Sequence, residues 1–207
     1  ESPPATVVLD GLACESVSQQ FNLNTVELPP SILMVVDRSG SMYDSWGVTK
    51  SAVGQVLGDL GPDAETGLVL YPSGSSCSVT EAPQVPLGPN QSNAIVAAMQ
   101  TAGTGGATPM GRAMKRARLY LETEGTLNTT VVLAADGKPS DTCLEDCTGC
   151  DCTDESTCLW CADLIQCTYN EVRNEVELLH DMGIKTFVIG YEGGFGATGF
   201  LETLASS

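Results

Sequence analysis

The chain carries a polar turn, residues 37–41 with the sequence Asp-Arg-Ser-Gly-Ser, directly behind the apolar run 31–36. An apolar run of this length, rich in branched residues, predicts a buried parallel strand. The strand would deliver one carboxylate and two hydroxyls into an exposed turn. Oxygen ligands held this close together suit a hard divalent cation such as Mg²⁺, Mn²⁺ or Ca²⁺. A purely structural alternative stays open, in which Asp37 forms the turn and Ser39 caps a helix.

Two later segments have related features. The stretch 105–114 is a glycine-containing loop with Thr108, followed by the start of a helix, and the stretch 131–139 is a strand followed by Asp136 in an Asp-Gly-Lys-Pro turn. Together with the Asp-x-Ser-x-Ser turn, and in this order, the segments resemble a von Willebrand factor A domain with its metal-ion-dependent adhesion site. The resemblance covers roughly residues 31 to 205 and is nearest to secreted or surface-attached bacterial members.

The resemblance implies a set of metal-site residues, which are Asp37, Ser39, Ser41, Thr108 and Asp136. Both serines would be direct hydroxyl ligands, and Thr108 a direct or water-bridged one. Asp37 and Asp136 would neutralise charge through ordered water. The cation would be Mg²⁺ or Mn²⁺, with Ca²⁺ as an alternative, and it would keep a position open for an acidic group of a protein or glycan partner.

Strand and helix patterns alternate along the chain, which predicts an α/β fold with a doubly wound, mostly parallel sheet flanked by helices. The expected strands are 31–36, 66–71, 130–135 and a buried strand 184–189, with 77–80 as a short edge strand. The expected helices are 47–60, 90–99, 109–121, 170–181 and one that begins at 199. In such sheets ligands bind at the carboxyl ends of the strands, where all three motifs fall.

The predicted domain organisation has two parts. Residues 1–30 are expected to form an N-terminal extension packed on the domain, and residues 31–207 the A-type domain itself. A cysteine-rich insertion is expected at 143–167, after the fourth core strand. The resemblance implies a further strand and a last helix, which we do not expect within residues 31–207.

Cysteines are concentrated in that insertion, which holds seven of the nine in the chain. Dense cysteine in a segment with little apolar material favours disulfides and an oxidising compartment. The pairs 147/150 and 158/161 have CxxC spacing, so zinc ligation is the alternative. The odd count leaves one cysteine without a partner within this sequence.

The chain is strongly acidic, with 26 Asp and Glu against 9 Lys and Arg, a net charge of −17. This charge disfavours nucleic acid and anionic membrane surfaces as partners, since both would repel the protein. No stretch is long and apolar enough to predict a transmembrane segment.

These features predict an extracellular or cell-surface binding module that grips a protein or glycan through a bound cation. The alternative is an intracellular adaptor for an ATP-driven, chelatase-like machine, as in another branch of the family. An enzyme is not expected, because no nucleophile is paired with a base and the only histidine, His180, lies outside the motifs. Tyr43, Asp44 and Trp46 would either line the contact surface or, for Trp46, pack against the insertion.

Overall fold

The computed structural model describes residues 28–74, 76–126, 128–143, 164–191 and 198–205. Residues 1–27 of the expected N-terminal extension and most of the cysteine-rich insertion, including its two CxxC pairs, lie outside these ranges. The predictions made for them, and for the domain boundaries, therefore stay predictions.

Five strands form one sheet in the order β3-β2-β1-β4-β5. The strands are β1 Ser31–Asp37, β2 Glu65–Tyr71, β3 Val85–Gly88, β4 Thr129–Ala135 and β5 Lys185–Gly190. β3 runs antiparallel to β2, and the remaining neighbours pair in parallel. The prediction of a mostly parallel sheet is confirmed.

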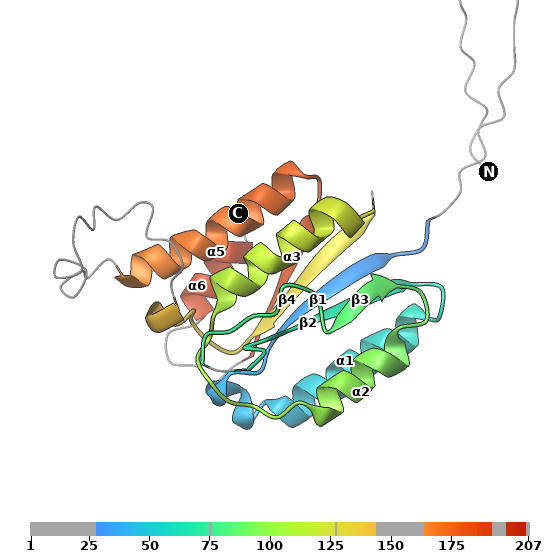
Figure 1. The fold of residues 1–207 in the computed structure, drawn as a ribbon, viewed down its shortest axis with the longest axis horizontal. Coiled ribbons are helices and arrows are strands. Elements are labelled where there is room, and N and C mark those ends of the chain that lie inside the picture. Colours follow the sequence, from blue (N-terminus) through green and yellow to red (C-terminus); the bar gives the residue numbers. More distant parts are fainter. Residues whose placement is uncertain (1–27, 75, 127, 144–163, 192–197, 206–207) are drawn as a thin grey trace, which may run out of the picture.

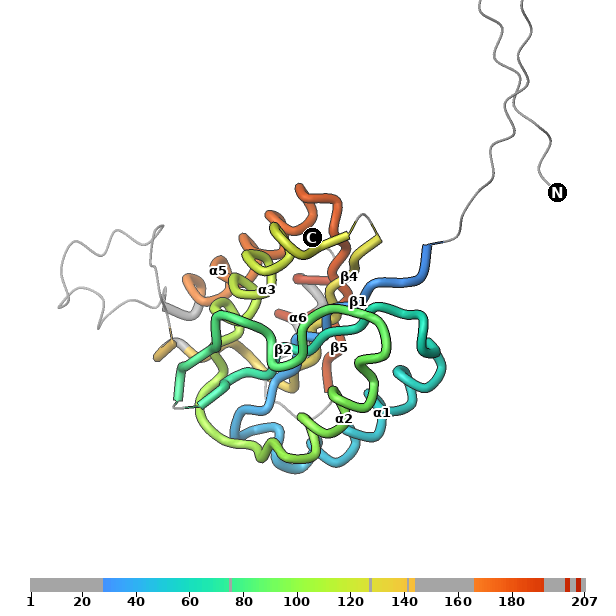
Figure 2. The backbone as a smooth tube through the Cα atoms, turned by 45° about the vertical axis from the view of Figure 1, so that its right-hand side comes forward, coloured from blue at the N-terminus to red at the C-terminus, as the bar shows by residue number. Residues whose placement is uncertain are grey.

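Helices cover both faces of this sheet, which confirms the α/β fold class (Figure 1). One layer holds α1 Trp46–Leu60 and α2 Ser92–Thr101; the other holds α3 Met110–Glu124, α5 Leu164–Asp181 and α6 Thr198–Ala205. The backbone trace of Figure 2 shows the same two layers from a second direction. Among the described residues, no helix is long and apolar enough to cross a membrane.

The central strand β1 is buried on both faces because its side chains alternate between the two helix layers. Leu33 and Val35 pack in the core beneath α3, α5 and α6. Met34 and Val36 pack in the core beneath α1 and α2. The same alternation decides where functional side chains at the end of the strand point.

The short edge strand was predicted in the wrong place. Residues 77–80 are not a strand, and the edge strand β3 contains Pro86. Pro86 is exposed, and the ladder joins Thr66 to Gly88 and Leu68 to Val85 around it. A proline is tolerated here because an edge strand can turn the missing N–H away from its neighbour.

Two other expectations need correction. Helix α5 begins at Leu164, so the last residues of the expected insertion 143–167 are helical. The last strand, β5, is not buried on both faces, since Phe187 is 59% and Ile189 47% exposed. β5 lies at the edge of the sheet, and α6 packs on its other face, where Gly190 meets Leu201.

Candidate metal centre

The predicted site residues lie at the carboxyl edge of the sheet. Asp37 is the last residue of β1, and Asp136 directly follows β4. The two strands are parallel neighbours in register, with Val36 opposite Ala134, so their ends meet. The topology therefore brings together two carboxylates that are 99 positions apart in the sequence.

Hydrogen bonds connect four of the five residues in one chain. The backbone N–H of Ser39 donates to Oδ1 of Asp37 at 2.7 Å. The hydroxyl oxygens of Ser39 and Ser41 lie 3.0 Å apart. The Ser41 hydroxyl donates to Oδ1 of Asp136 at 2.9 Å. The backbone N–H of Ser39 and the hydroxyls of Ser39 and Ser41 thus link the two carboxylates.

The fifth residue, Thr108, is brought alongside by backbone contacts of its loop. The N–H of Gly40 donates to the carbonyl of Gly106 at 3.1 Å, and the N–H of Ser140 donates to the carbonyl of Thr108 at 2.9 Å. The loop therefore lies between the serine turn and the segment that follows Asp136. Thr108 itself is 9% exposed.

A glycine is required in this loop at position 106. Its φ of +83° is in the left-handed region, which L side chains rarely adopt. A Cβ there would also lie 2.9 Å from Cγ of Pro72. The Gly-Gly-Ala-Thr sequence thus lets the Thr108 loop pass close to the end of β2.

Asp37 is fully buried, although the sequence suggested an exposed turn. Its Oδ2 has no hydrogen-bond partner among the described residues. Burial, with a smaller contribution from the neighbouring charge of Asp136, raises the pKa of Asp37 to about 7. Hydrogen bonds from Ser39 lower the pKa but do not offset the effect of burial. A buried carboxylate oxygen without a partner is costly. The site therefore has the charge and the free oxygen that a divalent cation would satisfy.

Tyr71 is a candidate site residue that the sequence reasoning missed. It ends β2 directly opposite Asp37 in the parallel register and is fully buried. Its hydroxyl has no hydrogen-bond partner among the described residues. Burial, and then the charges of Asp37 and Asp136, raise the pKa of Tyr71, so the hydroxyl keeps its proton. The signal available in the sequence was its place at the end of the neighbouring strand.

The chemistry of these donors suits a hard cation. Among the described residues, no three Asp, Glu, His or Cys side chains form a group that could hold a metal. A site here would depend on hydroxyls as well as on the two carboxylates, and oxygen donors of this kind suit Mg²⁺ or Mn²⁺. Ser41 and Gly40 are exposed, so the site opens to solvent on the side of the serine turn.

The residues behind the turn divide between surface and core. Tyr43 is 77% exposed and Asp44 is exposed, so both can contact a partner. Trp46 is 6% exposed and packs in the core under α1 and α2, where its indole N–H donates to the carbonyl of Ala102 at 3.0 Å. Trp46 is therefore not part of a contact surface.

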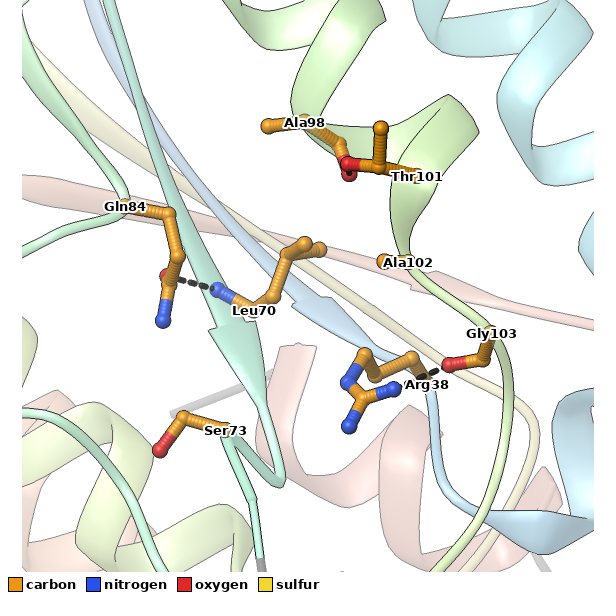
Figure 3. A pocket seen from close by; sticks show the side chains of 8 residues that line it. All are labelled: Arg38, Leu70, Ser73, Gln84, Ala98, Thr101, Ala102 and Gly103. Atoms are coloured by element: carbon orange, nitrogen blue, oxygen red, sulfur yellow. Dashed lines mark hydrogen bonds between the residues drawn. The ribbon is translucent and has the colours of Figure 1, made fainter.

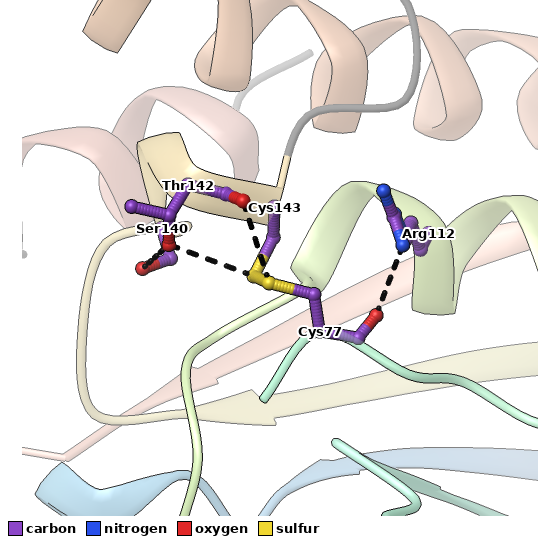
Figure 4. Close-up of a disulfide and its surroundings, with 5 residues drawn as sticks. All are labelled: Cys77, Arg112, Ser140, Thr142 and Cys143. Atoms are coloured by element: carbon purple, nitrogen blue, oxygen red, sulfur yellow. Dashed lines mark hydrogen bonds between the residues drawn. A yellow bond between two sulfur atoms is a disulfide. The ribbon is translucent and has the colours of Figure 1, made fainter. Parts of the chain in front are cut away.

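A disulfide joins Cys77 to Cys143 across the Thr108 loop (Figure 4). Cys77 belongs to the segment after β2, whose Ser76 carbonyl accepts the N–H of Ala107 at 3.0 Å. Cys143 ends the short segment that follows Asp136. In that segment the N–H of Ser140 donates to the carbonyl of Thr108. The bond thus ties together the two segments that flank the loop. Cys167 is also disulfide-bonded, so all three cysteines in the described ranges are paired.

The family of the chain is decided by a match over most of its length. The profile of the von Willebrand factor type A domain matches residues 31–207. The chain belongs to this family. No curated relative matches the sequence of this A domain.

Solved structures share the fold of this A domain at low sequence identity. Proximal thread matrix protein 1 from the mussel byssus is 18% identical with a TM-score of 0.57, over 85% of this chain and 39% of that one. The von Willebrand factor domain of the pilus tip protein Mfa5 from Porphyromonas gingivalis is 13% identical with a TM-score of 0.58, over 88% and 86%. The pilus adhesin SpaC from Lactobacillus rhamnosus GG is 18% identical with a TM-score of 0.56, over 80% and 25%. The A domain thus spans well under half of the first and last of these proteins.

The buried carboxylate of Asp37 makes the metal-free domain sensitive to pH. The unfolded chain releases this proton near the ordinary pKa of 3.8, whereas the folded chain holds it up to about 7. Without metal, the Asp37 contribution to the free energy of unfolding should therefore fall between about pH 4 and 7, by at most about 4 kcal/mol. Thermal unfolding in EDTA at a series of pH values measures this trend.

The matched control for the pH experiment is Asp37→Asn, which cannot ionise at this position. The difference in stability between this variant and the unmodified chain should grow as pH rises. Equal pH dependence of the two proteins would contradict the assignment of a raised pKa to Asp37.

Proposed function

We propose that this chain is a divalent-cation-dependent binding module of an extracellular or cell-surface protein. Ser39, Ser41 and Thr108 would hold the cation, with Asp37 and Asp136 supplying the negative charge. A bound Mg²⁺ or Mn²⁺ supplies a coordination position that an acidic group of a protein or glycan partner can take. The acidic chain itself would repel such a partner, so the cation would have to provide the local attraction.

One observation carries the cation proposal. Two carboxylates linked through Ser39 and Ser41 lie at the carboxyl edge of the sheet, and one of them, Asp37, is buried with an oxygen that has no partner in the described part of the chain. Without a cation, the ionised Asp37 would be buried beside the like charge of Asp136. A divalent cation removes this repulsion and completes the bonds of the free oxygen.

The fold and the cysteines support the proposed location. SpaC, which shares the fold, is a pilus adhesin. A disulfide between Cys77 and Cys143 is stable in an oxidising compartment and rare in a reducing one. Both observations favour a surface module over the intracellular adaptor.

Binding without catalysis is part of the proposal. The Ser41 hydroxyl donates to Asp136 and contacts the Ser39 hydroxyl, and both hydroxyls would act as ligands. His180 is exposed in the last turn of α5, which leads into the start of β5 and so lies at the opposite edge of the sheet from the site. From the opposite edge of the sheet, the His180 side chain cannot reach either serine to act as a base.

The proposal predicts that retention of an acidic ligand depends on metal. The immobilised chain should retain polyglutamate or polygalacturonate in Mg²⁺, release it in EDTA, and retain it again when Mg²⁺ is restored. Retention should survive moderate salt, because a metal–carboxylate bond is screened less than exposed charges. Ser39→Ala should lose retention, and Asp59→Asn, an exposed acid on α1, should keep it. Equal retention in EDTA and Mg²⁺ would refute a role for the cation.

A further inference from the structure

A polar cavity lies at the carboxyl edge of the sheet, on the side of α1 and α2. It has a volume of about 350 Å³ and is lined by residues from the ends of β1, β2 and α2, with Arg38 among them (Figure 3). Arg38 follows Asp37 directly, and the two side chains leave the strand toward opposite helix layers. The loop between α2 and α3 joins the cavity to the candidate metal centre, because Gly103 of this loop lines the cavity and Thr108 of the same loop is a candidate metal-site residue.

Arg38 gives this cavity a positive charge. Its Nε donates to the carbonyl of Pro72 at 2.7 Å and its Nη1 donates to the carbonyl of Gly103. Both acceptors are neutral, and no carboxylate in the described ranges forms an ion pair with Arg38. A guanidinium has five N–H donors in all, so three remain for a ligand. An anionic group in the cavity would neutralise this charge.

The hydroxyls in the cavity present acceptors to a ligand. The Thr101 hydroxyl donates to the carbonyls of Ala97 and Ala98, each at 3.0 Å. The Ser73 hydroxyl donates to the carbonyl of Ser78 at 3.2 Å. With its proton engaged, each oxygen offers only lone pairs. These lone pairs would repel a bare carboxylate but accept a bond from a ligand hydroxyl.

The amide of Gln84 and the apolar lining complete the cavity. Oε1 of Gln84 accepts the N–H of Leu70 at 2.6 Å, and Nε2 of Gln84 donates to the Thr80 hydroxyl at 2.9 Å. One hydrogen of the Gln84 amide is then left for a ligand. Leu70, Ala98 and Ala102 add apolar surface. A ligand that fits needs an anionic group, hydroxyl donors and some apolar surface in one compact unit.

We propose that the cavity binds one uronic acid unit of an acidic glycan whose neighbouring unit places its carboxylate on the cation. This rests on the proposed function, since it names the partner class of that same site. The carboxylate of the unit meets Arg38, its hydroxyls donate to Ser73 and Thr101, and its ring packs on the apolar wall. An acidic peptide has no hydroxyls to donate, so it fits the cavity less well.

Calorimetric titration of the whole chain in Mg²⁺ with three matched ligands tests this inference. The ligands are trigalacturonic acid, the neutral trisaccharide galactotriose, and triglutamate. Trigalacturonic acid should bind most tightly, and more tightly than monomeric galacturonic acid, because only the oligomer reaches both places. Arg38→Gln should weaken it by about 10- to 100-fold and Thr101→Val by about 2- to 10-fold.

Control variants separate the cavity from the fold and from the metal. Thr123→Val removes a comparable exposed threonine that donates to its own helix, on α3, and should change nothing. Arg116→Gln is the corresponding control for Arg38. Mn²⁺ affinity should be unchanged in Thr101→Val, which touches neither the serine turn nor the Thr108 loop. Arg38→Gln also removes two loop contacts, so Thr101→Val is the deciding variant.

Three results would overturn the inference. Triglutamate binding as tightly as trigalacturonic acid would assign the site to acidic peptides. Unchanged trigalacturonic acid binding in Thr101→Val and Arg38→Gln would show that the cavity is not used. Failure of the chain to bind either carboxylate ligand, while it still binds Mn²⁺, would refute the proposed function as well. This third result is therefore distinguishable from the first two, which refute only the inference.

Discussion

Asp37→Asn is expected to weaken Mn²⁺ binding by about 10- to 100-fold, the range typical for loss of a carboxylate that supports a metal site. The asparagine keeps the shape of the side chain and can still accept the N–H of Ser39, which lies 2.7 Å from Oδ1 in the unmodified chain. It removes the negative charge that the cation would neutralise. Isothermal titration with Mn²⁺ at pH 8 measures the effect.

The fold should survive this substitution. Asp37 is fully buried, so removing its charge relieves a desolvation cost, and the stability in EDTA at pH 8 should not fall. Asp59→Asn changes the net charge by the same amount at an exposed position and should leave Mn²⁺ affinity unchanged. Equal Mn²⁺ affinity in Asp37→Asn and the unmodified chain would remove Asp37 from the site.

Loss of the Cys77–Cys143 disulfide is expected to have the second-largest effect. Replacing both cysteines by serine should lower the free energy of unfolding by about 2–5 kcal/mol, since the bond closes a loop over 66 positions. It should also lower Mn²⁺ affinity by roughly tenfold, because the segments that hold the Thr108 loop are no longer tied together. Denaturant unfolding and Mn²⁺ titration measure the two effects.

The double serine variant is preferable to a reducing agent, which would also attack the disulfide of Cys167. Mn²⁺ affinity is to be measured where the variant is fully folded by circular dichroism, so that lost affinity is not lost fold. A destabilised variant with unchanged Mn²⁺ affinity would show that the bond supports the fold but does not position the Thr108 loop.

The part of the fold that local pattern determines could be predicted from the sequence. The run 32–36 is apolar throughout, which favours a parallel strand buried on both faces, and β1 is such a strand. Parallel strands end at one edge, so Asp37 and Asp136 could be expected to meet there before any register was known. The hydrogen-bonded chain through Ser39 and Ser41 follows from this meeting.

Features that depend on register and packing could not be predicted. Tyr71 lies beside Asp37 because of the register in which β1 pairs with β2, and the sequence alone does not determine that register. Cys77 pairs with Cys143 from the expected insertion because the Thr108 loop brings their segments together. The exposure of Phe187 reflects its place at the edge of the sheet, since an apolar run alone does not say whether both faces are covered.

Titration of the unmodified, metal-stripped chain with Mn²⁺, followed by electron paramagnetic resonance of the free ion, tests the central claim most directly. The account predicts one tight site per chain, competed by Mg²⁺, and weakened at pH 5, where Asp37 holds its proton. Several weak sites, unaffected by Mg²⁺ or by Ser39→Ala, would instead indicate diffuse attraction to an acidic surface. That result would contradict a cation held by the serine turn.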